Sequence, residues 1–164
     1  MVQEEAMSRI VLHLPIYTFH IDSGQHVSNI VYVQWMEIGR NKLLEEVGLP
    51  VHEIAKDRGI APVLVSTEIT YKKQLFLGDK VRMELWLSEL GNASAVMEFL
   101  FLNDSGTEVA AGRQKGIFFN TATKRPHRLS EAERKLFTTY LEIRPDPAYD
   151  TLRRNPLPVE GQKR

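Results

Sequence analysis

A carboxylate stands just ahead of a strongly apolar segment near the start of the chain. Asp22 belongs to the run Asp-Ser-Gly-Gln-His, and apolar residues at helical spacing begin at Ile30. The first amide groups of a helix have no acceptor within the helix, and the helix dipole favours negative charge there. A base or nucleophile beside amides that can hold developing negative charge is a candidate catalytic site. An Asp at this place can also simply satisfy loop amides.

The segment that positions Asp22 has the pattern of a helix buried on several sides. Apolar residues follow helical spacing from Tyr32 to Val47, and others occupy much of the opposite side. Ser28 or Asn29 is suited to cap the start, and Pro50 follows the expected end. We expect this helix to be the centre of the fold.

Strands account for most of the remaining pattern. One is expected at residues 16–21, because Pro15 interrupts the earlier alternation. After Gly59 the period changes to two residues, and strands joined by short turns are expected at residues 63–74, 81–88, 93–102 and 108–121. The strand at 93–102 is apolar on both faces, so we expect both to be covered. One face of the strand after Gly59 is expected to carry Val63, Val65, Thr67, Ile69 and Tyr71.

The C-terminal part of the chain predicts a short helix and a tail. Ser130 and Glu133 have the spacing of a capping box, and apolar residues continue to residue 141. Residues 142–164 hold prolines among charges and have little to bury, which predicts an extended or disordered tail. We therefore expect a single domain over residues 1–141, with its last helix at about 130–141.

Composition excludes several classes of function. The chain has 164 residues, of which 43% are hydrophobic, and equal totals of 21 basic and 21 acidic residues. No net field attracts nucleic acid, and cysteine is absent, which excludes disulfides, thiolate metal sites and a cysteine nucleophile. The five histidines show no metal-ligand spacing, so no metal is expected. No membrane-length apolar run or signal-peptide pattern is found, and we expect a cytoplasmic protein with no membrane partner.

The segment DSGQHVSNIVYVQWMEIGRNKLLEEVGL resembles the active loop and central helix of the hotdog-fold acyl-CoA thioesterases of the 4-hydroxybenzoyl-CoA thioesterase type. That family has an Asp, a Gly-containing turn, often His-Val-x-Asn, then a Tyr, a Glu-x-x-Arg and a closing Gly-Leu. The resemblance implies an α+β hotdog fold, in which an antiparallel sheet of about five strands wraps around one long central helix. The matching positions are Asp22, His26, Asn29, Tyr32, Glu37, Arg40, Gly48 and Leu49.

The resemblance also implies an activity. It points to hydrolysis of a fatty or aryl acyl thioester to the free acid and coenzyme A, with Asp22 as general base or nucleophile. The backbone amide of Asn29 would hold the oxyanion, and His26 is a further candidate, as a base or a substrate-orienting donor. Acyl carrier protein can replace coenzyme A as the thiol carrier, and no cofactor is expected. A homodimer or homotetramer is expected, with active sites at the subunit interface.

Substrate contacts are expected from several other positions. Ser66 and Thr67 lie on a strand that borders the acyl pocket in relatives, although both also suit an ordinary strand. Tyr32 is able to line an acyl or aryl pocket, and core packing explains it equally well. Phosphates of coenzyme A require basic side chains, and Lys72 with Lys73 is one pair able to serve. In relatives the nucleotide contacts the last long strand and the segment after it, which here carry Arg113, Lys115, Lys124 and Arg125.

Two departures from the family pattern support an alternative function. His20 stands where many relatives have an acidic residue, and Gln25 stands where they have Gly. The alternative is a hotdog module that binds acyl thioesters or another protein without hydrolysis. A hotdog dehydratase is a third possibility, but His26 with Glu37 fits its motif poorly, and Glu37 also suits an ion pair with Arg40.

Overall fold

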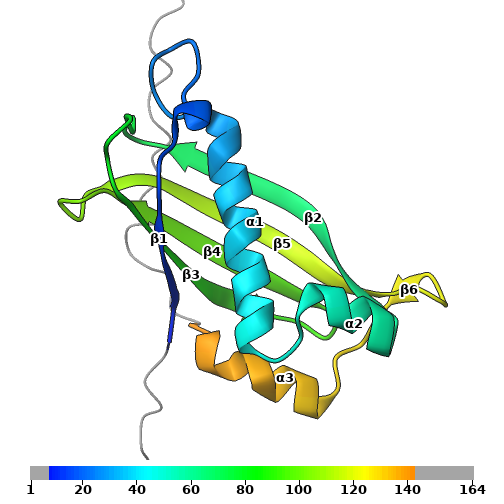
Figure 1. The fold of residues 1–164 in the computed structure, drawn as a ribbon. Coiled ribbons are helices and arrows are strands. Elements are labelled where there is room, and N and C mark those ends of the chain that lie inside the picture. Colours follow the sequence, from blue (N-terminus) through cyan, green and yellow to red (C-terminus); the bar gives the residue numbers. More distant parts are fainter. Residues whose placement is uncertain (1–7, 143–164) are drawn as a thin grey trace, which may run out of the picture.

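A long helix lies across one face of a curled antiparallel sheet in the computed structural model (Figure 1), which describes residues 8–142. The helix is α1, Asn29–Glu46. The sheet has the strand order β1-β3-β4-β5-β2, and β6 pairs with β5 beyond this path. The strands are β1 Ile10–Leu14, β2 Ile60–Tyr71, β3 Val81–Leu90, β4 Ser94–Leu102, β5 Glu108–Asn120 and β6 Arg125–Pro126. The expected sheet around a central helix is confirmed.

The shorter helices α2, Val51–Arg58, and α3, Glu131–Phe137, lie near the C-terminal end of α1 (Figure 1). The capping box expected for α3 is present, because Ser130 Oγ accepts from the Glu133 amide and Glu133 accepts from the Ser130 amide. Glu142, the first residue of the expected tail, donates its amide to the Leu87 carbonyl at 2.8 Å. The rest of that tail lies outside the described residues.

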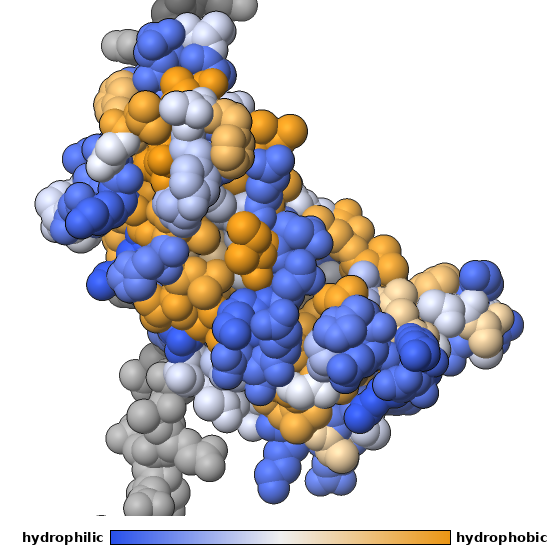
Figure 2. All heavy atoms as spheres, in the orientation of Figure 1, coloured by the Kyte–Doolittle hydropathy of each residue, from blue (hydrophilic) through white to orange (hydrophobic). Residues whose placement is uncertain are grey.

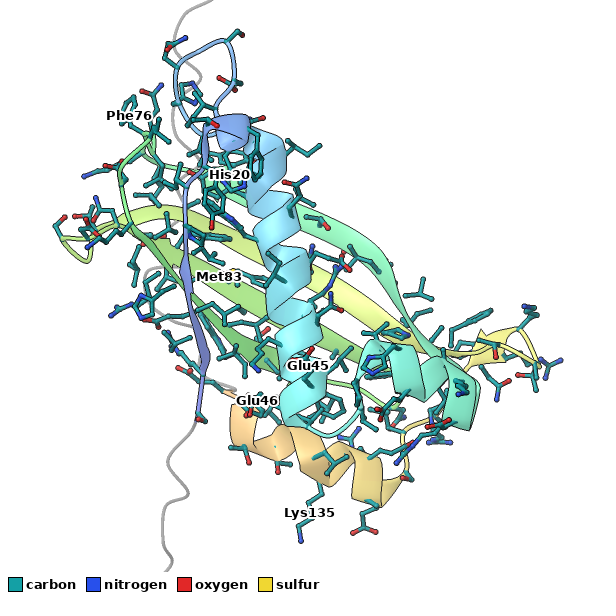
Figure 3. All side chains as sticks on the ribbon, viewed as in Figure 1. His20, Glu45, Glu46, Phe76, Met83 and Lys135 are labelled. Atoms are coloured by element: carbon teal, nitrogen blue, oxygen red, sulfur yellow. The ribbon has the colours of Figure 1, made fainter. Side chains whose placement is uncertain are left out.

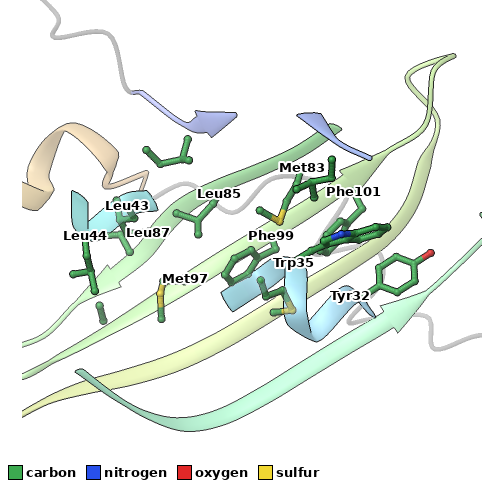
Figure 4. Packing of buried hydrophobic residues seen from close by; sticks show 14 of the residues in the cluster. Tyr32, Trp35, Leu43, Leu44, Met83, Leu85, Leu87, Met97, Phe99 and Phe101 are labelled. Atoms are coloured by element: carbon green, nitrogen blue, oxygen red, sulfur yellow. The ribbon is translucent and has the colours of Figure 1, made fainter. Parts of the chain in front are cut away.

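The core forms between α1 and the inward side of the sheet (Figure 4). Tyr32 and Trp35 of α1 make ring contacts with Phe101 of β4 at centroid distances of 5.3 and 6.2 Å. Gly39 lets the helix come close, since a Cβ at this position would lie 2.7 Å from Met83 Cε. Within residues 8–142, no helix combines the length and the apolar character that a membrane span requires.

The expectation that α1 is buried on several sides is wrong for the single chain. Ile30 and Ile38 are 63% and 48% exposed, on the side of the helix that faces away from the sheet. In Figure 2, hydrophobic surface gathers around the first half of α1, and hydrophilic surface surrounds its end. The apolar side away from the sheet is therefore available to another surface.

The first strand lies earlier than residues 16–21, where the sequence pattern placed it. β1 ends at Leu14 and pairs with β3, and Thr18–His20 form a single 3-10 turn. Pro15 ends the strand instead of interrupting a longer one. The His20 ring is buried and accepts a hydrogen bond from the Tyr17 amide at 3.1 Å, which stabilises the turn.

A β-bulge in β2 changes which residues face the helix. The pairing of β2 with β5 shifts between Leu64 and Ser66. Val63, before the bulge, is exposed, and Val65, within it, is 57% exposed. Thr67, after the bulge, lies on the inward side, where it accepts a hydrogen bond from Gln114. The expected single face from Val63 to Tyr71 is therefore wrong, because one extra residue reverses the alternation. By contrast, the expected burial of β4 on both faces is confirmed.

Candidate active site

The loop that carries Asp22 is closed by backbone pairing and leads directly into α1. The Ser28 amide donates to the His20 carbonyl at 2.9 Å, Ile21 and Val27 form an antiparallel bridge, and the Asp22 amide donates to the His26 carbonyl at 3.1 Å. These bonds hold residues 20 and 28 side by side, so the chain makes a narrow hairpin before the helix begins. Asp22 and His26 are paired at the outer end of this hairpin.

The carboxylate and the imidazole converge on Gly24. Asp22 is exposed, and its Oδ1 accepts a hydrogen bond from the Gly24 amide at 2.8 Å. A Cβ added at Gly24 would lie 2.8 Å from His26 Nε2 and 3.1 Å from Asp22 Oδ1. Glycine is therefore required for the two side chains to approach each other here. The other side of the imidazole, Nδ1, lies 3.2 Å from the Val27 carbonyl oxygen.

The two departures from the family pattern have local explanations. Gln25 has a φ of 65°, in the left-handed region that glycine favours. The backbone at this position therefore has the conformation that suits the Gly of the family pattern, although the residue is Gln. His20, the last residue of the 3-10 turn, lies beside the start of α1 (Figure 3). Its ring is in edge contact with the rings of Phe19 and Trp35. Its ring therefore has a packing role that the sequence pattern did not predict.

The N-terminus of α1 has no side-chain cap. Ser28 is the N-cap residue, but its side chain accepts no hydrogen bond from the first turn. Within residues 8–142 the amides of Asn29 and Ile30 have no hydrogen-bond acceptor. The Asn29 carbonyl accepts a hydrogen bond from the Tyr71 hydroxyl at 3.2 Å, which ties the first turn to the end of β2. Uncapped amides at the positive end of a helix dipole form a site for an anion or an oxyanion.

A hollow of about 240 Å³ adjoins this helix end. Burial raises the pKa of Tyr32 to about 12 and also raises the pKa of Tyr71, so both phenols stay protonated at neutral pH. Lys72 forms an ion pair with Glu108 at 2.9 Å. The hollow is lined by His26, Val27, Asn29, Tyr32, Tyr71, Lys72, Lys73 and Gln74.

The remaining predicted substrate residues lie away from the Asp22 loop in the single chain. Ser66 is opposite Lys115 on the outward side of the sheet, and Arg113 on that side pairs with Glu89 at 2.8 Å. Thr67 is on the inward side and accepts a hydrogen bond from Gln114. Lys124 and Arg125 follow β5, at the far end of the molecule from the start of α1 (Figure 1).

Two contacts were missed by the sequence analysis. Tyr71 was expected only to share a strand face with Val63 and Thr67, and no local motif signals its bond to Asn29, which is 42 residues away in the chain. Gln114 is 1% exposed and links Arg40 to Thr67, although glutamine on a strand gives no local sign of burial. Within the described part of the chain, no group of three His, Cys, Asp or Glu residues is arranged to hold a metal ion.

Comparisons with known proteins identify the family of this chain. Residues 18–146 match the sequence profile of the thioesterase-like superfamily, and the chain belongs to that superfamily. The chain is 29% identical over 75 residues to YneP of Bacillus subtilis (strain 168), named as a candidate acyl-CoA thioesterase. This match covers 46% of the chain and 54% of YneP, about half the length of that relative.

Solved structures share the whole fold. The DHNA-CoA thioesterase from Staphylococcus aureus has a TM-score of 0.71 and 18% identity, covering 89% of this chain and 93% of that one. The protein SAV2348 from Staphylococcus aureus, solved in complex with CoA, has a TM-score of 0.78 and 16% identity, covering 85% and 88%. These similarities confirm the hotdog fold that the resemblance implied.

Proposed function

We propose that this protein is an acyl-CoA thioesterase that hydrolyses an acyl thioester to the free acid and coenzyme A. The observation that carries the proposal is the hairpin that holds Asp22 directly before the uncapped start of α1. The superfamily match supports it, as do the thioesterase names of YneP and the DHNA-CoA enzyme and the CoA bound to SAV2348. No cofactor beyond the coenzyme A of the substrate is proposed, and the proposed compartment is the cytoplasm.

In this mechanism the thioester carbonyl oxygen accepts a hydrogen bond from the Asn29 amide. Asp22 either activates or supplies the nucleophile that attacks the carbonyl carbon. Asp22 either removes a proton from the attacking water or attacks directly to give an anhydride that water then cleaves. Either route releases coenzyme A as the thiol. One oxyanion donor contributes about 3–4 kcal/mol of transition-state stabilisation. In this proposal His26, whose ring lies beside Gly24, orients the substrate or the water.

A second copy of the chain completes the proposed site. β2 is a free sheet edge of 12 residues, and antiparallel pairing of two β2 strands across a twofold axis would close it. Such pairing sets the Tyr71 end of one copy against the Ile60 end of the other. The turn that carries Lys124 and Arg125 would then approach the Asp22 loop of the opposite copy and meet the phosphates. The proposed assembly is a homodimer, which two copies of the dimer can extend to a tetramer.

Thiol release from short, long and aryl acyl-CoA esters tests the activity. We expect turnover by the wild type and a loss of at least a hundredfold for Asp22→Asn, while Asp104→Asn, in the exposed turn between β4 and β5, keeps wild-type activity. Acyl carrier protein thioesters in the same assay identify the carrier. If the esters bind but neither protein releases thiol, the hydrolase proposal fails and a non-catalytic binding module replaces it.

A further inference from the structure

A cavity of about 130 Å³ lies under the C-terminal half of α1, away from the Asp22 loop. Protein interiors are close-packed, so a void of this size is unusual. An apolar cavity of about 150 Å³ in another protein binds benzene. The space therefore suits an apolar group of similar size. Its apolar walls include Leu43, Leu44, Leu87, Ala95, Met97 and Phe137.

Small residues on the inward side of the sheet create the space. Ala95 of β4 is opposite Gly116 of β5, and both line the cavity. A Cβ at Gly116 would already lie 3.4 Å from Met97 Cε. Val63 and Leu64 also line the cavity and are 42% and 40% exposed, so it opens beside the free edge of β2. In the single chain a small molecule can therefore enter without unfolding of the core. In the proposed dimer the β2 edge is joined to the partner, and entry is beside Val51 of α2, which also lines the cavity and is 38% exposed.

A cation stands at the rim of this apolar space. The Arg40 side chain is 17% exposed and lines the cavity together with Glu37 and Asn41. The guanidinium donates to Gln114 Oε1 at 2.9 Å and to Glu37 Oε2, which uses two of its five N–H donors. Within residues 8–142, no acceptor takes the other three.

Buried Gln114 holds this guanidinium from the inside. Gln114 Nε2 in turn donates a hydrogen bond to Thr67 Oγ1 of β2 at 3.0 Å. Arg40 is therefore fixed between the helix and the sheet. Glu37, by contrast, has a side chain that is 59% exposed, and it can move into water. A carboxylate that entered the cavity would replace one carboxylate partner of Arg40 by another, with the bidentate geometry that arginine favours.

We propose that this cavity is a binding site for a small apolar carboxylate, with its apolar body inside and its carboxylate on Arg40. Benzoate and hexanoate are of this class. The product of the proposed thioesterase reaction is also a carboxylic acid, but the site does not require the hydrolytic activity. It stands on the cavity, the partly buried cation and the open donors.

Methyl NMR on the full-length protein with 13C-labelled methionine tests the proposal. Addition of sodium benzoate should shift the methyl signal of Met97, which lines the cavity, and leave that of Met83, which lies deeper under Gly39. Toluene, a neutral probe of the same size, should bind at least tenfold more weakly than benzoate. Asp22→Asn should bind benzoate as the wild type does, which separates this site from the proposed catalytic one.

Variants at the rim and in the wall complete the test. Arg40→Met should weaken benzoate binding at least tenfold, Arg40→Lys should retain part of it, and Glu37→Gln should strengthen it. Ala95→Leu should fill the cavity and abolish the shift, with circular dichroism as a check on folding. The proposal fails if benzoate leaves the Met97 signal unchanged, or if toluene and benzoate bind equally well. It also fails if folded Arg40→Met, or folded Arg40→Lys, binds benzoate fully and shows no preference for it over toluene.

Discussion

Asp22 and His26 are brought together by the backbone of one short loop. Asp22 Oδ1 is held by the Gly24 amide, and the loop is closed by three backbone contacts that lead into α1. The orientation of the carboxylate is therefore fixed by hydrogen bonds within the loop and does not require a bound substrate. Most of these constraints lie between residues 20 and 29, where a local sequence motif can signal them. One does not, because the Val27 amide donates to the Leu75 carbonyl at 2.8 Å and ties the loop to a distant segment.

Gln25 carries the strain of this loop, because its φ of 65° is unfavourable for a residue with a Cβ. We expect Gln25→Gly to stabilise the fold by about 0.5 kcal/mol, since the relief of strain exceeds the added entropy of the unfolded chain. Gln25→Val should destabilise it by about 1–2 kcal/mol, because β-branched residues suit this region least. Urea unfolding midpoints measure both changes, and equal midpoints for the two variants would contradict the account.

α1 and β2 are joined by hydrogen bonds at two levels. Near the start of the helix Tyr71 donates to the Asn29 carbonyl, and further along Gln114 of β5 links Arg40 to Thr67. The hollow beside the start of α1 lies at the first level, and the cavity under the C-terminal half of α1 lies at the second level and beyond it. The position of the first turn of α1, and thus of the Asn29 amide, depends on Tyr71.

Tyr71→Phe tests this dependence. Loss of one hydroxyl bond should lower kcat about two- to tenfold while KM changes little, because Asn29 is proposed to act on the transition state. Tyr17→Phe is a suitable control, since Tyr17 is 52% exposed on the 3-10 turn and its ring contacts are kept in Phe. Equal kinetics for Tyr71→Phe and the wild type would show that the bond does not position the amide.

Most elements with a regular period were predictable, apart from β1, which was expected at residues 16–21, and the irregularities were not. α1 was found because its apolar spacing is strong, and α3 because Ser130 and Glu133 form a local capping box. The bulge at Leu64–Ser66 was missed because pairing with β5 decides it. Gln114 was missed for the same reason, since its partners Arg40 and Thr67 are distant in the chain.

Within residues 8–142, the sheet has two unlike edges. β1, with five residues, forms one edge, and β2, with 12 residues, forms the other. The long edge carries the exposed valines Val63 and Val65, and α1 exposes Ile30 and Ile38 on its side away from the sheet. Long apolar edges and faces of this kind favour association with another chain.

Charge on the long edge should separate the chains. We expect the double variant Val63→Lys with Val65→Lys to elute as a monomer and to lose thioesterase activity, because like charges would meet across the twofold axis. Val11→Lys is the matched control, since Val11 is 48% exposed on the opposite edge strand. Light scattering after gel filtration measures the mass. A dimeric, active double variant would rule out pairing through β2.

The Gln114 bridge also bears on how the sheet acquires its alignment. If β5 slipped by one residue against its neighbours, Gln114 would turn outward, and Arg113 or Lys115 would turn toward the core. Arg40 and Thr67 would lose their shared partner, and a second cation would enter an apolar space. The native alignment of β5 is therefore favoured over this one, because it alone gives Gln114 both partners and keeps Arg113 and Lys115 on the outward side.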